Sequence, residues 1–365
     1  MNQRLEKLQT WMRENEIDVS FLTSSENVFY LSGYYTNPHE RLLALVVFQE
    51  KEPFLVCPGM EIHDAKRSGW DHEIIGYSDT ENPWELVQQS IHKRNNKLSK
   101  AAIEKEHMNV ERFEQLSGLF PSASFVSAEE KLRLLRMIKN EKELKIIEEA
   151  CALADYAVEF GCSEIKEGKT ELDVLNALEY ALKQKGVTEM SFATMVLTGA
   201  NAASPHGNPG QTRIQKGDLV LFDLGVVVDR YCSDITRTVA FGDINDKQKE
   251  IYDTVLKSQL AAIEASMPGN TAAEVDITAR KIISEAGYGE YFPHRLGHGL
   301  GISVHEYPSM TSTNPLVLEE GMVYTIEPGI YVPDVAGVRI EDDVFITKDG
   351  AKVLTKFPKE LQIIK

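Results

Sequence analysis

The sequence predicts an α+β fold in two domains, with a smaller α/β domain preceding a larger one built from two αα-β halves. A chain of 365 residues is longer than an average domain, and its 42% apolar and 26% charged residues are typical of globular proteins. Residues 1–128 alternate short apolar runs with helical patterns, as α/β domains do. From residue 140 onward, two helices followed by a strand-rich region occur twice, which indicates halves related by a pseudo-two-fold axis.

The N-terminal domain, residues 1–128, has four apolar runs that predict strands, at residues 17–22, 42–48, 53–57 and 73–77. Residues 83–93 predict a helix, and the first twelve residues predict an amphipathic helix whose charges interrupt any apolar stretch that a signal peptide requires. Residues 129–160 predict a long charged helix with a break near Lys139 and Asn140. We therefore assign residues 129–139 to a helical linker and residues 140–365 to the second domain.

The composition excludes several classes of partner. The formal net charge is −17, and no run of Lys or Arg exceeds two residues, so we expect no nucleic-acid or anionic-membrane surface. No apolar run is long enough to cross a membrane. The four cysteines have no CxxC spacing and do not resemble a disulfide framework, so we expect reduced, buried thiols in a cytoplasmic protein: Cys57, Cys151, Cys162 and Cys232.

The second domain repeats one arrangement of helix caps. In each half, a glycine precedes a threonine that predicts a helix N-cap, and a second glycine predicts the C-cap of that helix. Each residue of the first set lies 101 positions before its counterpart: Gly168, Thr170 and Gly186, then Gly269, Thr271 and Gly287. One histidine and two acids follow each helix pair: His206, Asp223 and Asp234, then His305, Glu327 and Glu341. We infer that the acids converge between the halves.

Residues 218–241 predict a β-hairpin with a two-residue turn at Asp229 and Arg230. The resulting register pairs Val228 with Tyr231, Asp223 with Thr236, and Gly225 with Asp234. Asp223 and Asp234 then project from one face of the hairpin at diagonal positions, ~7–8 Å apart. Two carboxylates without a basic partner are costly to bury, and a bound cation removes that cost. Two aspartates that face solvent on a half-exposed sheet remain the alternative.

Three further residues are candidates for the same cluster. Glu327 ends an apolar run and is followed by Pro-Gly, which stops a strand, and Glu341 lies in Val-Arg-Ile-Glu-Asp-Asp. His298 is flanked by glycines that allow its ring to approach a centre closely. These glycines lack the GxGxxG spacing of a phosphate site, and His294 with His298 lacks the glutamate and the helix of the zinc-protease motif.

The charges of this cluster favour two metal ions. Four carboxylates carry four negative charges, which two divalent cations neutralise and one does not. Oxygen-rich ligation with a single imidazole and no thiolate suits Mn²⁺, with Co²⁺ or Zn²⁺ as alternatives, and paired metals are typical of hydrolytic enzymes. We therefore expect two divalent cations with these ligands: Asp223, Asp234, His298, Glu327 and Glu341.

The motifs around these residues resemble the pita-bread metallopeptidases, most closely the Xaa-Pro dipeptidases (prolidases) and Xaa-Pro aminopeptidases. The matching motifs are His206 in Ser-Pro-His-Gly, Asp223 in Phe-Asp-Leu-Gly, Asp234 in Ser-Asp-Ile-Thr-Arg-Thr, His298 in Gly-His-Gly-Leu-Gly, His305 in Val-His-Glu, Glu327 in Ile-Glu-Pro-Gly and Glu341 in Val-Arg-Ile-Glu-Asp. The resemblance implies a creatinase-like N-terminal domain, a pita-bread catalytic domain, two bound metals and a homodimer. Creatinase uses this fold without metals, and the intact ligand set here argues against that chemistry.

The chemistry of such a site, in agreement with the resemblance, implies three catalytic residues. We expect that a hydroxide bridging the two metals would attack the scissile carbonyl group and that Glu327 would relay its proton. His206 and His305 are expected to flank the site and to donate hydrogen bonds to the oxyanion and to the departing proline nitrogen. Which histidine serves which atom stays open.

Other residues are expected to support the site. The resemblance implies that His294 lines the substrate pocket. Arg339 lies two residues before Glu341 on the same strand face, so we expect it to hold the carboxylates in place, and we also count it among the candidate substrate-binding residues. Thr236 and Tyr231 are expected to do likewise.

Three functions remain open: an Xaa-Pro dipeptidase, an Xaa-Pro aminopeptidase acting on longer peptides, and a non-enzymatic peptide-binding protein. Residues 32–41 resemble a loop that in bacterial prolidases reaches the active site of the partner subunit, although Asn37 stands where those enzymes commonly have Asp. A dipeptide ends in a carboxylate directly after proline, which Arg295 and His39 are expected to recognise. We therefore favour the dipeptidase, whose substrate is a small peptide with proline at its second position.

Overall fold

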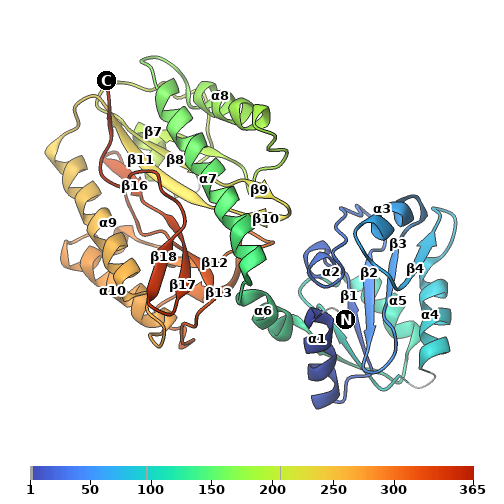
Figure 1. Ribbon diagram of the computed structural model, residues 1–365. Helices are drawn as coiled ribbons and strands as arrows, with labels where there is room; N and C mark the ends of the chain where they lie inside the picture. The colour runs from blue at the N-terminus through green and yellow to red at the C-terminus, as the bar shows by residue number, and fades with distance from the viewer. Residues whose placement is uncertain (1–2, 96–97, 206) are drawn as a thin grey trace. The chain divides into compact units, whose positions relative to one another are not determined.

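The structure is a computed structural model that describes residues 3–95, 98–205 and 207–365. It divides into two compact units, Met1–Arg136 and Met137–Lys365 (Figure 1). The division falls within the segment 129–139 that the sequence analysis assigned to a linker. No helix of the described residues is both long enough and apolar enough to span a bilayer.

The first unit is a six-stranded sheet covered by helices on both faces. Its strands follow the order β4-β3-β2-β1-β5-β6, in which β2 is antiparallel to β1 and β3 and the remaining pairs are parallel. Helices α4 and α5 pack on one face of the sheet, and α1 and α2 contact β2 from the other. The four predicted strands and the predicted helix are all present, with ends shifted by at most two residues. The elements are α1 (Gln3–Glu14), β1 (Val19–Leu22), α2 (Ser25–Ser32), β2 (Ala44–Phe48), β3 (Phe54–Pro58), η1 (Gly59–Glu61), α3 (Ile62–Arg67), β4 (Glu73–Tyr77), α4 (Pro83–Arg94), β5 (Lys100–Ile103), α5 (Val110–Leu119) and β6 (Ser124–Ser127).

The predicted break in the charged helix is confirmed. Helix α6 (Glu129–Met137) ends before Lys139, and helix α7 (Glu141–Glu164) begins after Asn140. Asn140 caps α7, because its side chain accepts from the backbone N–H of Glu143 while the Glu143 carboxylate accepts from the backbone N–H of Asn140.

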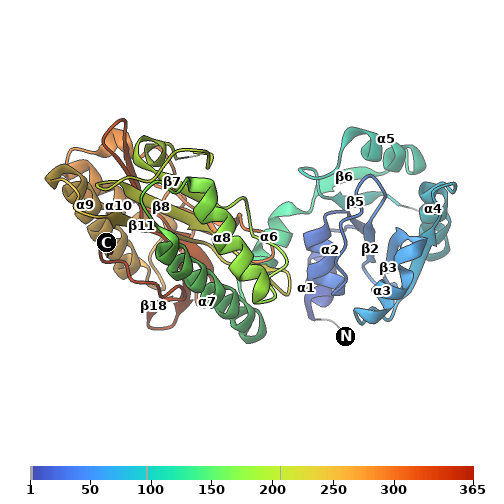
Figure 2. The same cartoon turned by 90° about the horizontal axis from the view of Figure 1, so that it is seen from above.

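The second unit has two helix pairs outside two sheets. Figure 2 shows the strands between α7 and α8 on one side and α9 and α10 on the other. The first sheet has the order β19-β11-β8-β7, the second has the order β13-β12-β14-β17-β18, and two-stranded ribbons pair β9 with β10 and β15 with β16. The elements are α8 (Glu171–Gln184), β7 (Met195–Thr198), η2 (Gly199–Ala203), β8 (Leu219–Leu224), β9 (Val227–Val228), β10 (Tyr231–Cys232), β11 (Ile235–Phe241), α9 (Asp246–Ala265), α10 (Ala272–Glu285), η3 (Gly289–Tyr291), β12 (Gly297–Gly299), β13 (Glu306–Met310), β14 (Val323–Ile326), β15 (Gly329–Val332), β16 (Ala336–Arg339), β17 (Asp342–Thr347), β18 (Gly350–Val353) and β19 (Ile363–Ile364).

Equivalent backbone hydrogen bonds relate the two halves of this unit. The N–H of Gly168 donates to Ile214 O, and the N–H of its counterpart Gly269 donates to Leu318 O, at 3.0 Å in both cases. Thr170 and Thr271 cap α8 and α10 with the same reciprocal capping box. Each helix pair packs on its own sheet around a separate apolar core. These equivalent contacts agree with the two αα-β halves expected from the sequence.

One detail of the predicted caps is corrected. The C-cap positions of α8 and α10 belong to Lys185 and Ala286, and the predicted glycines follow them. Gly186 and Gly287 have φ values of 91° and 86°, a left-handed conformation that glycine adopts without steric cost. The four cysteines are free and buried, as the sequence analysis expected.

Candidate metal centre

The acidic side chains reach one another because strand side chains alternate between two faces. On β8, Phe222 and Leu224 belong to the apolar core under α7 and α8, so Asp223 between them points to the opposite face. On β14, Ile326 belongs to the core under α9 and α10, so Glu327, the next residue, points away from that core. The alternation that builds two cores therefore also directs carboxylates away from both helix pairs.

The hairpin that carries Asp223 and Asp234 has the predicted turn and register. Asp229 and Arg230 have φ values of 44° and 72°, as a two-residue type I′ turn requires. Val228 pairs with Tyr231, and Asp223 pairs with Thr236. A Cβ on Gly225 would lie 1.9 Å from Ser233 O, so the two strands approach closely enough that only glycine fits there.

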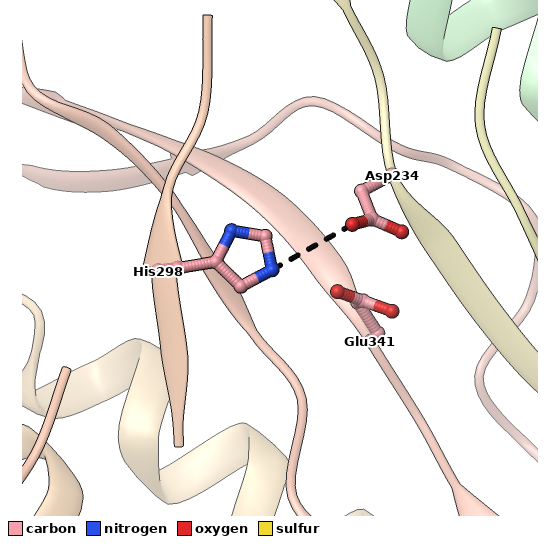
Figure 3. Close-up of side chains that lie close together, drawn as sticks. All are labelled: Asp234, His298 and Glu341. Atoms are coloured by element: carbon pink, nitrogen blue, oxygen red, sulfur yellow. Dashed lines mark ion pairs between the residues drawn. The ribbon is translucent and has the colours of Figure 1, made fainter. Parts of the chain in front are cut away.

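Three buried ligand atoms converge at the centre of this unit. One atom each from Asp234, His298 and Glu341 lies within 4.8 Å of the other two (Figure 3). His298 Nε2 lies 3.7 Å from Asp234 Oδ2 and 3.3 Å from Glu327 Oε1. The three residues come from separate segments, since His298 lies on β12, Asp234 directly precedes β11 and Glu341 directly precedes β17.

The tautomer of His298 follows from its other ring nitrogen. Nδ1 lies 3.1 Å from Gly299 O, and because a carbonyl only accepts hydrogen bonds, Nδ1 carries the proton. Burial lowers the pKa of His298 to about 3, so the ring is neutral. Its Nε2 lone pair therefore points toward carboxylate oxygens, which is the arrangement of a metal-ligating histidine.

Arg339 connects the carboxylates of Asp223 and Glu341, the second of them through Thr236. Its guanidinium pairs with Asp223, and its Nε donates to Thr236 Oγ1 at 3.0 Å. Thr236 Oγ1 in turn donates to Glu341 Oε2 at 2.6 Å. Arg339 and Thr236, both predicted as supporting residues, thus contact the carboxylates directly in the structure.

The cluster fits divalent cations. Asp234 Oδ1 and Glu341 Oε1 are buried and have no hydrogen-bond partner among the described residues. Burial, and next the charge of neighbouring carboxylates, raises the pKa values of Asp234 and Glu341 well above their usual range. A buried, ionised carboxylate without a partner destabilises the folded protein, and a cation coordinated by these oxygens would supply the partner. Oxygen donors with one imidazole match the preference of metals such as Mn²⁺.

Two predicted substrate residues lie beside the cluster. His294 Nε2 lies 3.0 Å from the hydroxyl of Tyr331, which also accepts a hydrogen bond of 2.7 Å from Arg339. Arg295 Nη1 donates to Ser309 Oγ at 3.3 Å, and Ser309 pairs with His298 across strands β12 and β13. Arg295 is thereby held next to the strand pair that carries His298.

His305 is in contact with the cluster, since its ring centroid lies 4.2 Å from that of His298. Partial burial lowers the pKa of His305, and the charge of Arg295 lowers it further. The ring is therefore mostly neutral at pH 7 and carries one N–H proton that it can donate.

Of the other predicted residues, His206 lies outside the described residues. His39 belongs to the first unit, where it is exposed, has a φ of 53° and donates its backbone N–H to Asn37 Oδ1. The hydroxyl of Tyr231 was expected to support a ligand, but it donates to Glu143 of α7 at 2.8 Å.

Two supporting residues were not predicted. Asp343 Oδ2 accepts the backbone N–H of Asp234 at 2.9 Å, and Thr325 Oγ1 donates to Glu327 Oε1 at 3.2 Å. Both lie two residues from a predicted ligand on the same strand face, so the period of two could have identified them.

Comparison with known proteins agrees with this site and fold. The model of metallopeptidase family M24 matches residues 145–348, and that of the creatinase/prolidase N-terminal domain matches residues 4–138. The protein YkvY of Bacillus subtilis is 57% identical over 361 residues, 99% of each chain. The Xaa-Pro dipeptidase of Lactobacillus helveticus is 47% identical over 362 residues, 99% of this chain and 98% of its own. The crystal structure of a prolidase from Pyrococcus horikoshii superposes with a TM-score of 0.92 at 40% identity, covering 99% of this chain and all of that one.

The two family models match one unit each, and the Bacillus relative aligns with 99% of the chain. A metallopeptidase family agrees with a cluster of side chains that could hold a metal ion. The chain is therefore a pita-bread peptidase with a creatinase-like N-terminal domain, and it belongs to metallopeptidase family M24.

Proposed function

We propose that this protein is an Xaa-Pro dipeptidase that uses two divalent metal ions, and that it acts in the cytoplasm as a homodimer. The observation that carries the proposal is the convergence of buried carboxylates on the unprotonated Nε2 of His298. The names of the similar Lactobacillus and Pyrococcus proteins support the choice of substrate.

The proposed ligands are the five residues expected from the sequence. Arg339 pairs with Asp223, and one divalent cation together with this guanidinium would still leave one of the four carboxylate charges unbalanced. This excess supports two cations, and the donor set supports Mn²⁺. When bound, two such ions would lower the pKa of a water molecule and polarise the scissile carbonyl group.

Glu327 and two histidines would carry out the proton transfers and hydrogen bonding of the hydrolysis. In the metal-free protein, burial raises the pKa of Glu327 to about 7, against the opposing charge of Arg339. Glu327 would accept the proton of the attacking water and pass it toward the proline nitrogen. His305 would donate a hydrogen bond to the developing oxyanion or to the leaving nitrogen, and His206 is proposed for the other of these roles.

The proposed substrate contacts distinguish a dipeptide from a longer peptide. Arg295 carries the positive charge expected to bind the C-terminal carboxylate of Xaa-Pro, and His294 would form an adjacent wall of the pocket. His39 is proposed to reach the active site of the partner subunit, where it would exclude a third residue.

Hydrolysis of Ala-Pro and of Ala-Pro-Ala by protein reconstituted with Mn²⁺ tests the proposal. A dipeptidase is expected to have a much higher kcat/KM for Ala-Pro. Equal cleavage of both peptides would assign the protein as an Xaa-Pro aminopeptidase. Binding of both peptides without turnover of either would support the peptide-binding alternative.

A further inference from the structure

The proposed substrate residues His294 and Arg295 lie in an irregular segment between η3 and β12. Such a segment has few ladder hydrogen bonds to fix its conformation, yet a binding side chain needs a fixed backbone. Arg280 on α10 provides this support, because its guanidinium donates to Phe292 O at 3.1 Å and to His294 O at 2.9 Å. It also lies over the ring of Phe292, with its Cζ 4.3 Å from the ring centroid.

Asp276 holds this guanidinium in place. It lies one turn earlier on α10, its side chain is fully buried, and its two carboxylate oxygens accept from Arg280 Nε and Nη2, each at 2.9 Å. Asp276 Oδ1 also accepts the backbone N–H of Leu296 at 3.2 Å. Asp276 and Arg280 therefore form hydrogen bonds with three backbone groups of the segment: Phe292 O, His294 O and Leu296 N–H.

An exposed ion pair spaced i,i+4 on a helix contributes little to stability, which gives little reason to bury a carboxylate completely. Here the carboxylate is buried, and the bidentate geometry leaves other guanidinium donors for the segment carbonyls. These contacts therefore fix the conformation of the irregular segment more than they stabilise helix α10.

We propose that Asp276 and Arg280 are positioning residues that fix His294 and Arg295 for substrate binding, and so determine KM. This proposal rests on the proposed function, because it takes these two side chains as substrate contacts. The metal ligands have separate supports: the N–H of His298 donates to Thr325 Oγ1 at 3.1 Å, and the carboxylates lie on other strands. Loss of the pair is therefore expected to change substrate binding while metal binding persists.

The test compares Arg280→Ala and Arg280→Lys with Lys281→Ala in Mn²⁺-loaded protein. Lys281 is the next residue of α10, has 70% of its side chain exposed and pairs with Glu285 at 3.8 Å. Among the described residues no hydrogen bond joins Lys281 to the segment, so it serves as the control on the same helix. For Arg280→Ala we expect KM for Ala-Pro to rise about ten- to a hundredfold, the cost of a misplaced binding group, with a much smaller change in kcat. Arg280→Lys keeps the charge and loses the bidentate fork, so its KM should be intermediate.

A second measurement is independent of catalysis. Hydrogen exchange of the backbone amides of residues 292–296 should be faster in both Arg280 variants than in Lys281→Ala, while the Mn²⁺ content per chain stays equal. Unchanged KM and unchanged exchange would overturn the proposal, as would loss of Mn²⁺ in parallel with activity. A wild-type protein that cleaves neither peptide would refute the proposed function, and the exchange rates would still decide whether the pair fixes the segment. If Arg280→Ala does not fold, Arg280→Lys provides both readouts.

Discussion

Replacing Thr236 with valine is expected to weaken metal binding without unfolding the protein. Valine has nearly the same shape and is equally suited to a strand, and Thr236 is fully buried on β11. The substitution removes the hydroxyl that donates to Glu341 Oε2 at 2.6 Å and accepts from Arg339 Nε at 3.0 Å. Glu341 then loses a partner that fixes the orientation of its carboxylate.

The expected loss of Mn²⁺ affinity follows from the lost hydrogen bond to the Glu341 carboxylate. A hydrogen bond to a charged group contributes about 1.5–3 kcal/mol. Since about 1.4 kcal/mol corresponds to a factor of ten, the dissociation constant for Mn²⁺ should rise about 10- to 100-fold. Loss of an outer partner of a metal ligand typically has an effect of this size.

The EPR signal of free Mn²⁺ during titration gives the dissociation constant directly. Thr194→Val is the matched control, because Thr194 is also a buried threonine of this unit, and its hydroxyl donates to the Glu179 carboxylate at 2.7 Å. Activity of Thr236→Val should return at high Mn²⁺ concentration. An affinity equal to that of the wild type or of the Thr194 variant would refute the role of this hydroxyl in orienting a ligand.

Three other outcomes are expected. Asp234→Ala should lose metal and nearly all turnover while its circular dichroism stays unchanged, and retention of two metals per chain would exclude Asp234 as a ligand. Because burial raises the pKa of Glu327 to about 7, the folded metal-free protein holds a proton that the unfolded chain releases at lower pH. Its melting temperature should therefore fall as the pH rises from about 6.5 to about 8, above the range in which the lowered pKa values of His298 and His305 oppose this effect, and Mn²⁺ should suppress the fall in a thermal-shift assay. His39→Ala or Arg295→Ala should raise KM for Ala-Pro far more than for Ala-Pro-Ala, and unchanged ratios in both variants would contradict the dipeptide-specific contacts.

The hairpin illustrates how much of the site could be predicted. Its turn residues, its alternating pattern and its register are local properties, so Asp223 was correctly paired with Thr236. Tyr231 lies in the same hairpin, but its hydroxyl donates to Glu143, which is 88 residues away. Strand alternation indicates which face a side chain occupies, but not which distant residue meets it there.

The sequence by itself determined the helix N-caps, the strand periods, the hairpin turn and the types of side chain that gather at the candidate metal centre. These follow from hydrogen bonds and steric preferences within a few residues of the chain. Only the tertiary structure decided that Arg339 pairs with Asp223 and that Arg280 supports the segment of His294. Such contacts join different elements, and they depend on how two helix pairs bury their apolar faces against two sheets, a packing that no local pattern specifies.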